Sequence, residues 1–369
     1  MPEITIVIGA RPNFMKAAPL IRALAATPFT PRVVHTGQHY DAAMSDVFLR
    51  QLGIAEPDVH LGVGSGSHGE QTARVLQGFE KYLANAPVPQ SGVVVVGDVN
   101  STLACAITAA KMQVPVAHVE AGLRSFDRTM PEEINRLVTD AVSDLLFVSE
   151  PSGVRNLEHE GVSGAKVHYV GNVMIDTLVH ELDAALALRV PEHFGLDPKG
   201  YAVATLHRPA NVDEPERLAA LIEFLLRVAG RLPVVFPMHP RTRARIEDAG
   251  LLGRLRGTPR ITLADPLGYR ENLGLMQGAK LVLTDSGGIQ EETSFLGVPC
   301  LTLRSNTERP ATLTHGTNTL VGDDLDAAGR EVERILSGVY RTGQSIDGWD
   351  GHAADRIARV LSVKWSGRS

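Results

Sequence analysis

Short apolar runs rich in β-branched residues alternate with longer segments of helical periodicity along the whole chain. One series lies in the first half and another in the second: ITIVIG, RVVHTG, VVVVGD, VPVAHVE and LLFVSE, then YAVATLH, PVVFPMH, RITLAD, KLVLTD and PCLTL. Runs that stay apolar at consecutive positions are typical of strands buried on both faces, as in parallel sheets covered by helices. The two series predict an α/β protein with two doubly wound, Rossmann-like domains.

We expect the domain boundary near VGNVMIDTL, where the last strand of the first series leads into a helix. The predicted organisation is an N-terminal domain over residues 1–172, a C-terminal domain over residues 173–350 and a terminal segment over residues 351–369. The terminal segment contains HAADRIARVLSV, whose apolar residues share one helical face, and it is long enough to pack on the N-terminal domain. A chain of 369 residues agrees with this division, because one hydrophobic core seldom grows so large.

Composition and charge narrow the possible function classes. With 44% hydrophobic and 21% charged residues, the chain has the composition of an ordinary globular protein. Its net charge of −6 argues against non-specific binding to nucleic acid or to an anionic membrane, because such binding requires a basic surface. The N-terminus lacks the basic region of a signal peptide and no apolar stretch reaches the length of a membrane span, so we expect a cytoplasmic protein.

Ligands of open parallel sheets bind at the carboxyl ends of the strands, so the residues that follow each strand are the first candidates. Arg11 and Lys16 follow ITIVIG at the start of a helix, where anions are favoured, although a solvated surface explains this pair equally well. Asp98 ends VVVVGD and Glu120 ends VPVAHVE. Two carboxylates at one site have different pKa values, so that one can act as a base and the other as an acid. An aspartate at a strand end can also simply cap a turn.

The second series places histidines at equivalent strand ends. His207 ends YAVATLH and His239 ends PVVFPMH, each with an arginine close behind it. Near neutral pH a histidine can transfer a proton or bind phosphate. A single histidine is more often a satisfied polar residue, but two at equivalent strand ends favour an anion site.

The most specific local motif is LVLTDSGGIQEE in the second half. Ser286 can cap a helix that begins with Gly287 and Gly288, and the missing side chains would let phosphate oxygens reach the amide donors. Glu292 lies further along this helix, where it can reach sugar hydroxyls, and Arg309 in NTERP is another candidate phosphate ligand. We interpret the motif as a nucleotide-diphosphate site, and a tight turn that needs glycine is the alternative.

The sequence does not indicate a metal centre or a nicotinamide cofactor. The 13 histidines show no spacing such as HExxH, no GxGxxG motif follows the first predicted strand ITIVIG, and GxSxG is absent. DLD at 324–326 matches the DxD string of metal-dependent sugar transferases, but it opens an amphipathic segment and we expect it to start a helix. Neither Cys105 nor Cys300 belongs to a disulfide or metal framework. We therefore expect no metal and no cofactor.

In order and spacing, the motifs resemble those of the non-hydrolysing UDP-N-acetylglucosamine 2-epimerases over essentially the whole chain. The matching segments are GARPNFMKAAPL, HTGQH, GDVNSTLA, HVEAGLR, PEEINR, GNVMIDTL, HRPANVD, LTDSGGIQEE, TERP and GTNTLVG. The resemblance implies a GT-B fold, with UDP held mainly by the C-terminal domain and the sugar in the interdomain cleft. It implies that UDP-GlcNAc and UDP-ManNAc are interconverted by elimination of UDP to a 2-acetamidoglucal and re-addition. It also implies that the protein binds a UDP-sugar as its substrate and that it forms a homodimer.

By motif, the resemblance assigns roles to individual residues in both domains. The assigned residues are Arg11 and Lys16 at the active-site rim; Asp98, Glu120 and Glu132 for acid–base catalysis; His207 at the diphosphate; Ser286, Gly287, Gly288 and Arg309 for phosphate; and Glu292 for ribose. Arg136 and His239 are further candidates for substrate binding, with Arg124 or Arg136 holding the carboxylates in place. Asp127 and Glu133 are interpreted as solvated or structural.

The chain also departs from the better-known members of this family. Pro209 follows Arg208 where those members carry a second arginine, and Tyr40 replaces an arginine after Gln38-His39, which argues against an activating second UDP-GlcNAc site. Several motifs, among them LRSFDRTMPEEINR and HPRTR, are closer to a branch that includes UDP-2,3-diacetamido-glucuronate 2-epimerases. That substrate carries an extra carboxylate, which Arg128, Arg241 or Arg243 could bind.

Two other activities stay open on the sequence alone. A GT-B glycosyltransferase would share the fold and the UDP site, and a hydrolysing epimerase would release free ManNAc. The acidic residues of the first half favour an epimerase, because glycosyl transfer requires no proton exchange at C2.

Overall fold

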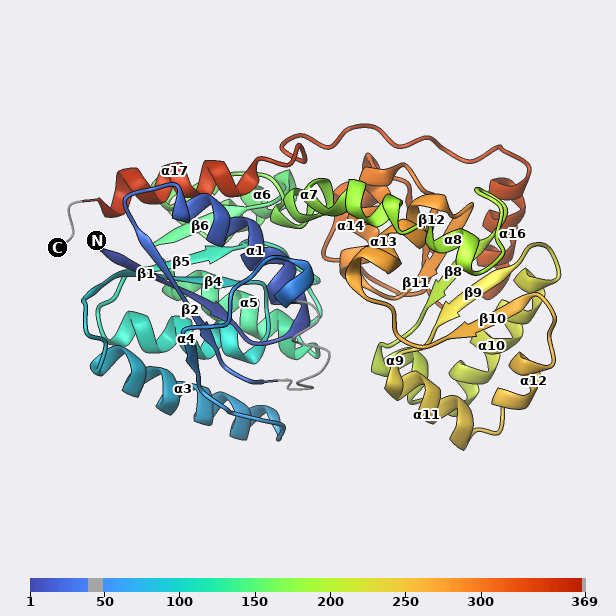
Figure 1. The fold of residues 1–369 in the computed structure, drawn as a ribbon, viewed down its shortest axis with the longest axis horizontal. Helices are drawn as coiled ribbons and strands as arrows, with labels where there is room; N and C mark the ends of the chain where they lie inside the picture. Colours follow the sequence, from blue (N-terminus) through green and yellow to red (C-terminus); the bar gives the residue numbers. More distant parts are fainter. Residues whose placement is uncertain (39–48, 367–369) are drawn as a thin grey trace. The chain divides into compact units, whose positions relative to one another are not determined.

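The computed structural model describes residues 1–38 and 49–366, apart from the side chain of Arg11 (Figure 1). The chain divides into two compact units. Unit 1 comprises Met1–His180 and Asp347–Ser369, and unit 2 comprises Glu181–Ile346. The division falls within helix α7 (Val173–Ala187), whereas the sequence places the boundary at the start of that helix.

The described part of unit 1 contains a seven-stranded sheet with the order β3-β2-β1-β4-β5-β6-β7, and every neighbouring pair is parallel. The strands are β1 (Glu3–Ile8), β2 (Thr30–His35), β3 (Val59–His60), β4 (Gln90–Val96), β5 (Val116–Val119), β6 (Leu145–Val148) and β7 (Val167–Tyr169). The helices are α1 (Arg11–Ala25), α3 (His68–Ala84), α4 (Asn100–Lys111), α5 (Pro131–Val142), α6 (Pro151–His159), the short 3₁₀ helix η1 (Gly164–Lys166), α7 and α17 (Ala353–Trp365).

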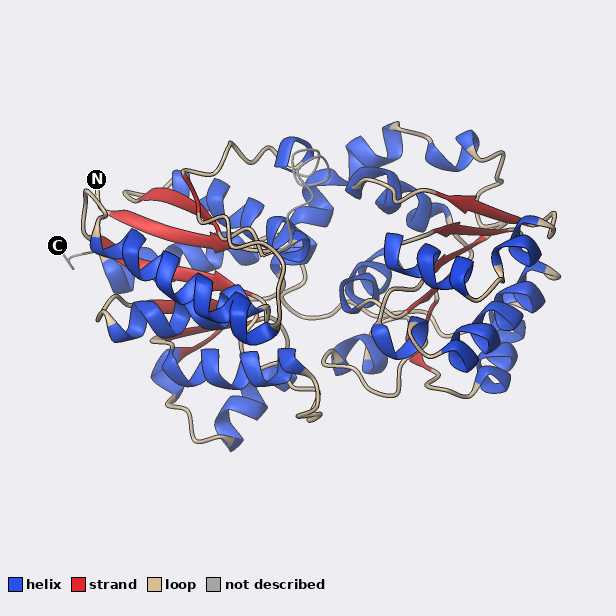
Figure 2. Ribbon diagram, turned by 90° about the horizontal axis from the view of Figure 1, so that it is seen from below, coloured by secondary structure: helices blue, strands red, loops and turns tan. Residues whose placement is uncertain are grey.

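Helices cover both faces of this sheet, with α1 and α17 on one side and α3 and α4 on the other (Figures 1 and 2). Val7, Val93 and Val95 of the strands pack with Phe79 of α3 and Cys105 of α4 in one buried cluster. Each such side chain contributes roughly 1.5–3 kcal/mol when it is removed from water. The apolar runs therefore become strands buried from both sides, as the sequence predicts.

Helix α17 is fixed to unit 1 at both of its ends. At its start, the Asp176 carboxylate accepts hydrogen bonds from the backbone N–H groups of Ala353 and Ala354 at 3.1 and 2.7 Å. At its end, the Trp365 indole packs against β4, where a Cβ on Gly92 would lie 2.4 Å from the ring. The last helix thus belongs to the first unit although most of unit 2 precedes it in sequence.

The described part of unit 2 contains a six-stranded parallel sheet with the order β10-β9-β8-β11-β12-β13. The strands are β8 (Ala202–Thr205), β9 (Val234–Pro237), β10 (Ile261–Ala264), β11 (Leu281–Thr284), β12 (Cys300–Thr302) and β13 (Asn318–Leu320). The helices are α8 (Val190–His193), α9 (Pro209–Val212), α10 (Pro215–Ala229), α11 (Pro240–Asp248), α12 (Leu252–Arg256), α13 (Tyr269–Gly278), α14 (Gly287–Leu296), α15 (Pro310–Thr314) and α16 (Leu325–Leu336).

Successive residues of β8 enter different cores of unit 2. Ala202 and Ala204 join the cluster that includes α10 and α16, whereas Val203 packs with Met276 of α13 on the opposite face. This alternation follows from the two-residue repeat of a strand. Together the two sheets confirm the predicted α/β class with two Rossmann-like units.

Helix α16 begins where the sequence predicts, directly after the DLD string. The Asp324 side chain accepts hydrogen bonds from the backbone N–H groups of Asp326 and Ala327 at 3.1 and 2.7 Å, so it acts as the N-cap. The helix-start interpretation of this string is confirmed. Among the described residues, no group of three or more His, Cys, Asp or Glu side chains has an arrangement that could hold a metal ion.

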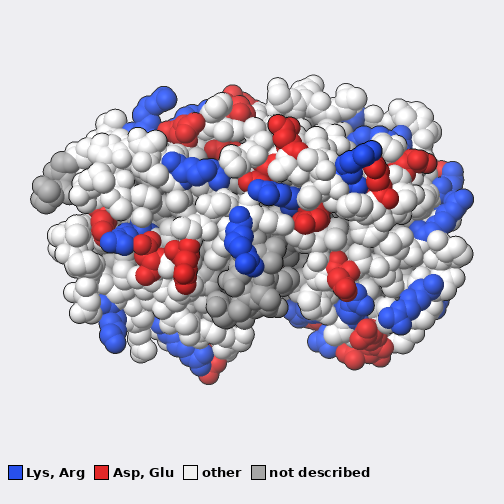
Figure 3. All heavy atoms as spheres, in the orientation of Figure 1, with Lys and Arg blue, Asp and Glu red and all other residues white. Residues whose placement is uncertain are grey.

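The surface and the helix lengths add two observations. On the face drawn in Figure 3, basic and acidic side chains are interspersed in small groups. Within residues 1–38 and 49–366, no helix combines the length and the hydropathy that a membrane span needs.

In both sheets the strand order reverses beside the first strand of the unit, between β1 and β4 in unit 1 and between β8 and β11 in unit 2. Loops after such neighbouring strands leave the sheet in opposite directions and open a crevice at its carboxyl edge. The order therefore brings the loops after β1, β4 and β5 together in unit 1, and those after β9, β8 and β11 together in unit 2.

Candidate functional site

In unit 1, the structure joins Lys16 of α1 to Glu120, the residue that follows β5, in a buried ion pair. Their side chains are only 8% and 6% exposed. Both lie over the turn after β4, since a Cβ on Gly97 would lie 3.0 Å from Lys16 Nζ and 3.5 Å from Glu120 Oε2. Gly97, with φ +69°, thus supplies a left-handed turn that leaves room for the pair.

Glu120 itself has a left-handed backbone with φ +78°. Such a conformation costs a residue other than glycine about 1–3 kcal/mol, and residues of this kind cluster at functional sites. The conformation is fixed by the hydrogen bond from the Glu120 N–H to the Phe147 carbonyl at 3.0 Å and by the ion pair to Lys16. Strain at this carboxylate therefore supports the interpretation of Glu120 as a functional residue.

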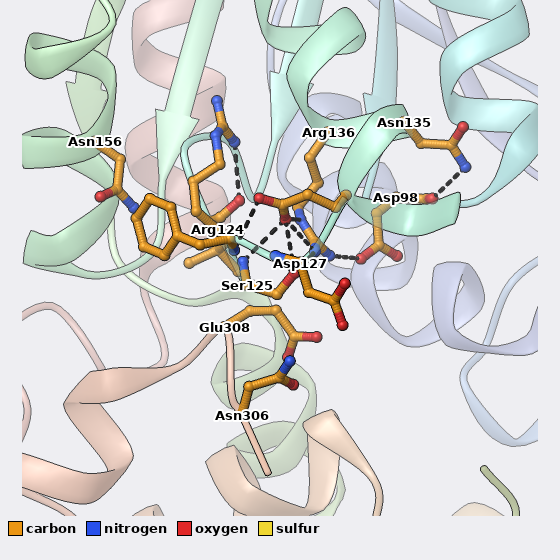
Figure 4. Close-up of polar contacts among 12 residues, drawn as sticks. Asp98, Arg124, Ser125, Asp127, Asn135, Arg136, Asn156, Asn306 and Glu308 are labelled. Carbon is orange, nitrogen blue, oxygen red and sulfur yellow. Dashed lines mark hydrogen bonds and ion pairs between the residues drawn. The ribbon is translucent and has the colours of Figure 1, made fainter. Parts of the chain in front are cut away.

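Asp98 lies at the same edge of the sheet but has a different partner (Figure 4). Its Oδ2 lies 2.5 Å from Arg136 Nη1, and its side chain is 30% exposed. Arg136 is buried and also pairs with Glu133 at 2.6 Å. Asn135 donates a hydrogen bond to the backbone carbonyl of Asp98 at 2.8 Å. Arg136 of α5 therefore holds the Asp98 carboxylate, whereas Arg124 does not.

Glu133 has the contacts of a structural residue. Its carboxylate accepts hydrogen bonds from the backbone N–H groups of Ser125 and Phe126 at 2.9 and 3.0 Å. Burial by itself raises the pKa of Glu133, but the hydrogen bonds from Ser125 and the Arg136 guanidinium outweigh it and lower the pKa below its usual value. Glu133 thus fixes the loop that precedes α5.

Glu132, its neighbour, is half-buried and makes no hydrogen bond or ion pair with another described residue. The structure thus pairs two of the predicted acids, Asp98 and Glu120, with cations, and it shows no such partner for Glu132 among the described side chains. The side chain of Arg11, another predicted site residue, lies outside the described part. Arg11 occupies the first position of α1.

A buried hydrogen-bond network around His118 and Asp140 holds the loops after β4 and β5 in place. The sequence did not predict this network. His118 Nδ1 lies 2.6 Å from the Asp140 carboxylate, and His118 Nε2 lies 2.8 Å from the Gly97 carbonyl. Asp140 also pairs with Arg124 at 2.7 Å and accepts a hydrogen bond from the Gly122 N–H at 3.1 Å. The sequence held a signal for it, because a histidine inside an apolar strand needs an internal partner.

In unit 2, His207 and His239 lie at the carboxyl ends of β8 and β9, with ring centroids 6.0 Å apart. The His239 side chain accepts a hydrogen bond from the Arg241 N–H at 3.3 Å and caps α11. His207 Nδ1 lies 2.9 Å from Asp285, which follows β11 and is completely buried. The structure therefore brings the two predicted histidines together and adds Asp285, which the sequence analysis did not select.

Helix α14 begins at Gly287, as predicted, but its cap differs from the prediction. Ser286 occupies the N-cap position, yet its side chain makes no capping hydrogen bond. The turn before the helix contains a different hydrogen bond, from the Ser286 N–H to Thr284 Oγ1 at 3.0 Å. The prediction that the Ser286 hydroxyl caps this helix is wrong, although the helix start is correct.

Arg309 lies against this helix start. A Cβ on Gly287 would lie 2.7 Å from Arg309 Nη1, so only glycine allows the guanidinium to approach so closely. Arg309 is held there by ion pairs to Glu291 at 2.9 Å and to Glu308 at 3.2 Å. A helix N-terminus and a guanidinium that face the same space form an anion-binding arrangement. Gly288 follows in the first turn of the same helix.

Glu292 lies further along α14 and is buried. It interacts with the Tyr269 hydroxyl, and burial together with the Glu292 charge raises the pKa of Tyr269. Glu292 is therefore an acceptor at the inner side of this site, where it could also bind a hydroxyl group of a ligand.

A cavity in the described part of unit 1 lies away from these residues. It has a volume of about 360 Å³ between α1, α7 and α17, and its polar lining residues include Arg22, Asp176 and His180. It contains none of the predicted site residues, so the chemistry of the strand ends, rather than this cavity, defines the candidate site.

A family model and individual relatives all match this chain to 2-epimerases of UDP-sugars. The family model for UDP-N-acetylglucosamine 2-epimerase matches residues 22–362. A UDP-N-acetylglucosamine 2-epimerase of Methanocaldococcus jannaschii is 40% identical over 98% of this chain and 99% of that protein. A UDP-2,3-diacetamido-2,3-dideoxy-D-glucuronate 2-epimerase of Pseudomonas aeruginosa is 42% identical with the same coverage of both chains.

Solved structures agree with these sequence matches. The crystal structure of the Methanocaldococcus jannaschii enzyme in complex with UDP-GlcNAc and UDP has a TM-score of 0.89 at 40% identity and covers 98% of this chain and 99% of its own. The structure of the Neisseria meningitidis UDP-GlcNAc 2-epimerase bound to UDP-GlcNAc has a TM-score of 0.88 at 29% identity, with 99% and 100% covered.

Proposed function

The chain belongs to the UDP-N-acetylglucosamine 2-epimerase family, and we propose that it interconverts UDP-GlcNAc and UDP-ManNAc without hydrolysing them. The observation that carries this proposal is the strained, buried Glu120, paired with Lys16 beside the Asp98–Arg136 pair at the carboxyl edge of the unit 1 sheet. Epimerisation at C2 requires one group that removes a proton and another that returns a proton to the opposite face. Acidic residues at one edge of a sheet supply both.

In the proposed reaction, a carboxylate of unit 1 removes the C2 proton while the C1–O bond to UDP breaks. This leaves a 2-acetamidoglucal and free UDP. UDP then adds again at C1, and a proton is delivered to C2 from the other face. Asp98, Glu120 and Glu132 form the acid–base group, and no cofactor or metal enters these steps.

Unit 2 is proposed to hold the UDP moiety. The negative charge that develops on the departing diphosphate is stabilised by fixed donors and cations. Ser286, Gly287 and Gly288 supply the start of α14, Arg309 supplies a guanidinium, and His207 and His239 supply imidazoles. Glu292 is assigned to the ribose hydroxyls.

The decisive experiment is incubation with UDP-GlcNAc in deuterated water, followed by NMR at C2. Deuterium at C2 together with formation of UDP-ManNAc supports the proposal. Release of free ManNAc would indicate a hydrolysing epimerase instead. Transfer of the sugar without exchange at C2 would indicate a glycosyltransferase.

A second substrate, UDP-2,3-diacetamido-glucuronate, is favoured by the 42% identical Pseudomonas aeruginosa relative. Its additional carboxylate requires a cation. Of the arginines expected to meet it, Arg241 pairs with Asp213 and Arg243 pairs with Asp265. Arg128, in the exposed loop before α5, makes no ion pair with another described residue, which makes it the best candidate.

The two substrates are separated by comparing C2 exchange for both, and by the variant Arg128→Ala. If the uronate is the substrate, this change raises the KM for the uronate at least about 10-fold, as expected for loss of a charged contact. Arg155→Ala is the matched control, since Arg155 of α6 is also exposed and makes no ion pair in the described part of the chain. An equal effect of both variants would argue against a role for Arg128.

We further propose that the enzyme works in the cytoplasm and, from the family resemblance, that it forms a homodimer. Light scattering coupled to gel filtration tests the oligomeric state. A monomeric mass of 39.6 kDa would contradict the dimer.

A further inference from the structure

Asp285 lies directly behind His207 in unit 2. The strands β8 and β11 are parallel neighbours in which Thr205 pairs with Thr284. The residues that follow them, His207 and Asp285, therefore meet at the carboxyl edge of the sheet, although 78 positions separate them in sequence. The sheet order alone brings this pair together.

The Asp285 carboxylate is completely buried and surrounded by hydrogen-bond donors. Oδ1 and Oδ2 accept from the His207 backbone N–H at 3.1 and 3.0 Å. Oδ2 also accepts from the Arg208 N–H at 2.9 Å and from Asn211 Nδ2 at 3.1 Å. Burial by itself raises the pKa of Asp285, but the His207 side chain, the Arg208 N–H and Asn211 outweigh it and lower the pKa below its usual value. The carboxylate is therefore ionised at neutral pH.

An ionised carboxylate beside an imidazole nitrogen requires a proton on that nitrogen. His207 Nδ1 lies 2.9 Å from Asp285 Oδ1, so Nδ1–H donates to the carboxylate. A partner on one ring nitrogen fixes the tautomer and the orientation of the ring, and it leaves the other nitrogen for the ligand. The His207 side chain is 39% exposed, whereas Asp285 is not exposed at all, so Nε2 is the nitrogen that a ligand can reach.

We propose that Asp285 is a positioning residue that keeps His207 protonated at Nδ1 and presents Nε2 to the diphosphate of the substrate. This inference rests on the proposed function for the identity of the ligand. Nε2 binds the departing diphosphate by donating a proton that it has taken up from solvent, and the buried carboxylate behind the ring compensates the positive charge of the imidazolium. Asp285 acts only through His207 and does not touch the substrate.

The first test needs no variant. Two-bond ¹H–¹⁵N correlation spectra of the full-length protein, recorded without UDP at a pH where the ring is neutral, report the tautomer of His207. The expected result is the Nδ1–H tautomer. The Nε2–H tautomer in the wild-type protein would overturn the proposal.

The second test is a double-mutant cycle between Asp285→Asn and His207→Ala. Loss of a residue that orients a functional group typically costs about 10- to 100-fold, so Asp285→Asn should lower kcat/KM for epimerisation by about that factor. In the His207→Ala background, the same change should cost less than about 2-fold, since Asp285 then has no ring to orient. An equal loss in both backgrounds would show that Asp285 is merely structural. Asp248→Asn, at an exposed aspartate of the same unit, is the control and should leave kcat/KM unchanged.

Failure of the Asp285 inference can be distinguished from failure of the proposed function. If the wild-type protein exchanges no C2 proton with either UDP-sugar, the proposed function fails, while the tautomer of His207 still reports on Asp285. If exchange occurs but the ring has the Nε2–H tautomer, the epimerase proposal stands and the role of Asp285 is wrong.

Discussion

Replacing Glu120 with glutamine separates the catalytic role of this residue from its structural one. The variant keeps the size of the side chain but removes its charge. It leaves the Lys16 ammonium, only 8% exposed, without the carboxylate that pairs with it. Removing one partner of a buried pair is costly because the remaining charge is neither hydrated nor compensated.

The expected loss of stability is about 3–5 kcal/mol, the usual result of breaking a buried ion pair. For a domain of the size of unit 1, each kcal/mol corresponds to about 2–4 °C, so the thermal midpoint should fall by about 6–20 °C. The double variant Lys16→Met/Glu120→Gln removes both charges and should recover most of this loss, because an apolar replacement of a buried pair is often neutral or stabilising. Glu160→Gln is the control, since Glu160 is 35% exposed and its Arg124 partner keeps Asp140, so it should cost at most about 1 kcal/mol.

Activity should respond differently from stability. Exchange at C2 should fall by about 10²–10⁴-fold in Glu120→Gln, the range for loss of a general acid or base, and the double variant should not restore it. UDP binding, measured by isothermal titration calorimetry, should stay within about 2-fold, since the proposed UDP ligands lie in unit 2. Wild-type exchange in Glu120→Gln would refute the acid–base assignment. Loss of UDP binding instead would place Glu120 in the UDP site, and a double variant as unstable as the single one would refute the ion-pair argument.

Two further predictions concern other parts of the chain. Gly287→Ala should weaken UDP binding at least about 10-fold in calorimetry, because the new Cβ would meet Arg309 Nη1 at 2.7 Å. Gly329→Ala is the control, since Gly329 lies inside α16 with open space around it. This control should stabilise the protein by about 0.5–1 kcal/mol and leave UDP binding unchanged. Asp140 is the subject of the second prediction. Burial by itself raises the pKa of Asp140, but His118 and Arg124 outweigh burial and lower this pKa below its usual value. Its contribution to stability is thus present above about pH 4 and is lost as the pH falls through the folded-state pKa. Guanidinium unfolding should accordingly show that Asp140→Asn destabilises at pH 7 and costs progressively less at lower pH, and a cost independent of pH would contradict this.

Much of the fold follows from local sequence patterns. A run such as VVVVGD can be buried on both faces only in a sheet covered by helices, which is why the α/β class and the strand positions are predictable. Helix starts are equally local, as Asp324 and Gly287 show. The Ser286 cap was wrong because a capping bond depends on the conformation of the turn before it, which the residue types did not reveal.

The site was only partly predictable, for a physical reason. The motifs indicate which residues are candidates, but not their partners. Lys16 and Glu120 are 104 positions apart, and the parallel order of β1, β4 and β5 decides that they meet. For the same reason Arg136 pairs with Asp98, while Arg124 pairs with Asp140 and Glu160 instead.

The sequence by itself thus determined the class of fold, the approximate positions of the strands and helices, the family resemblance and the types of chemistry available. The tertiary structure decided which charges are buried together, that Glu120 has a left-handed backbone, and that Asp285 lies behind His207. Periodicity and capping are short-range properties written in neighbouring residues. Ion pairs between distant strand ends depend on sheet order, which is fixed only when the whole core packs.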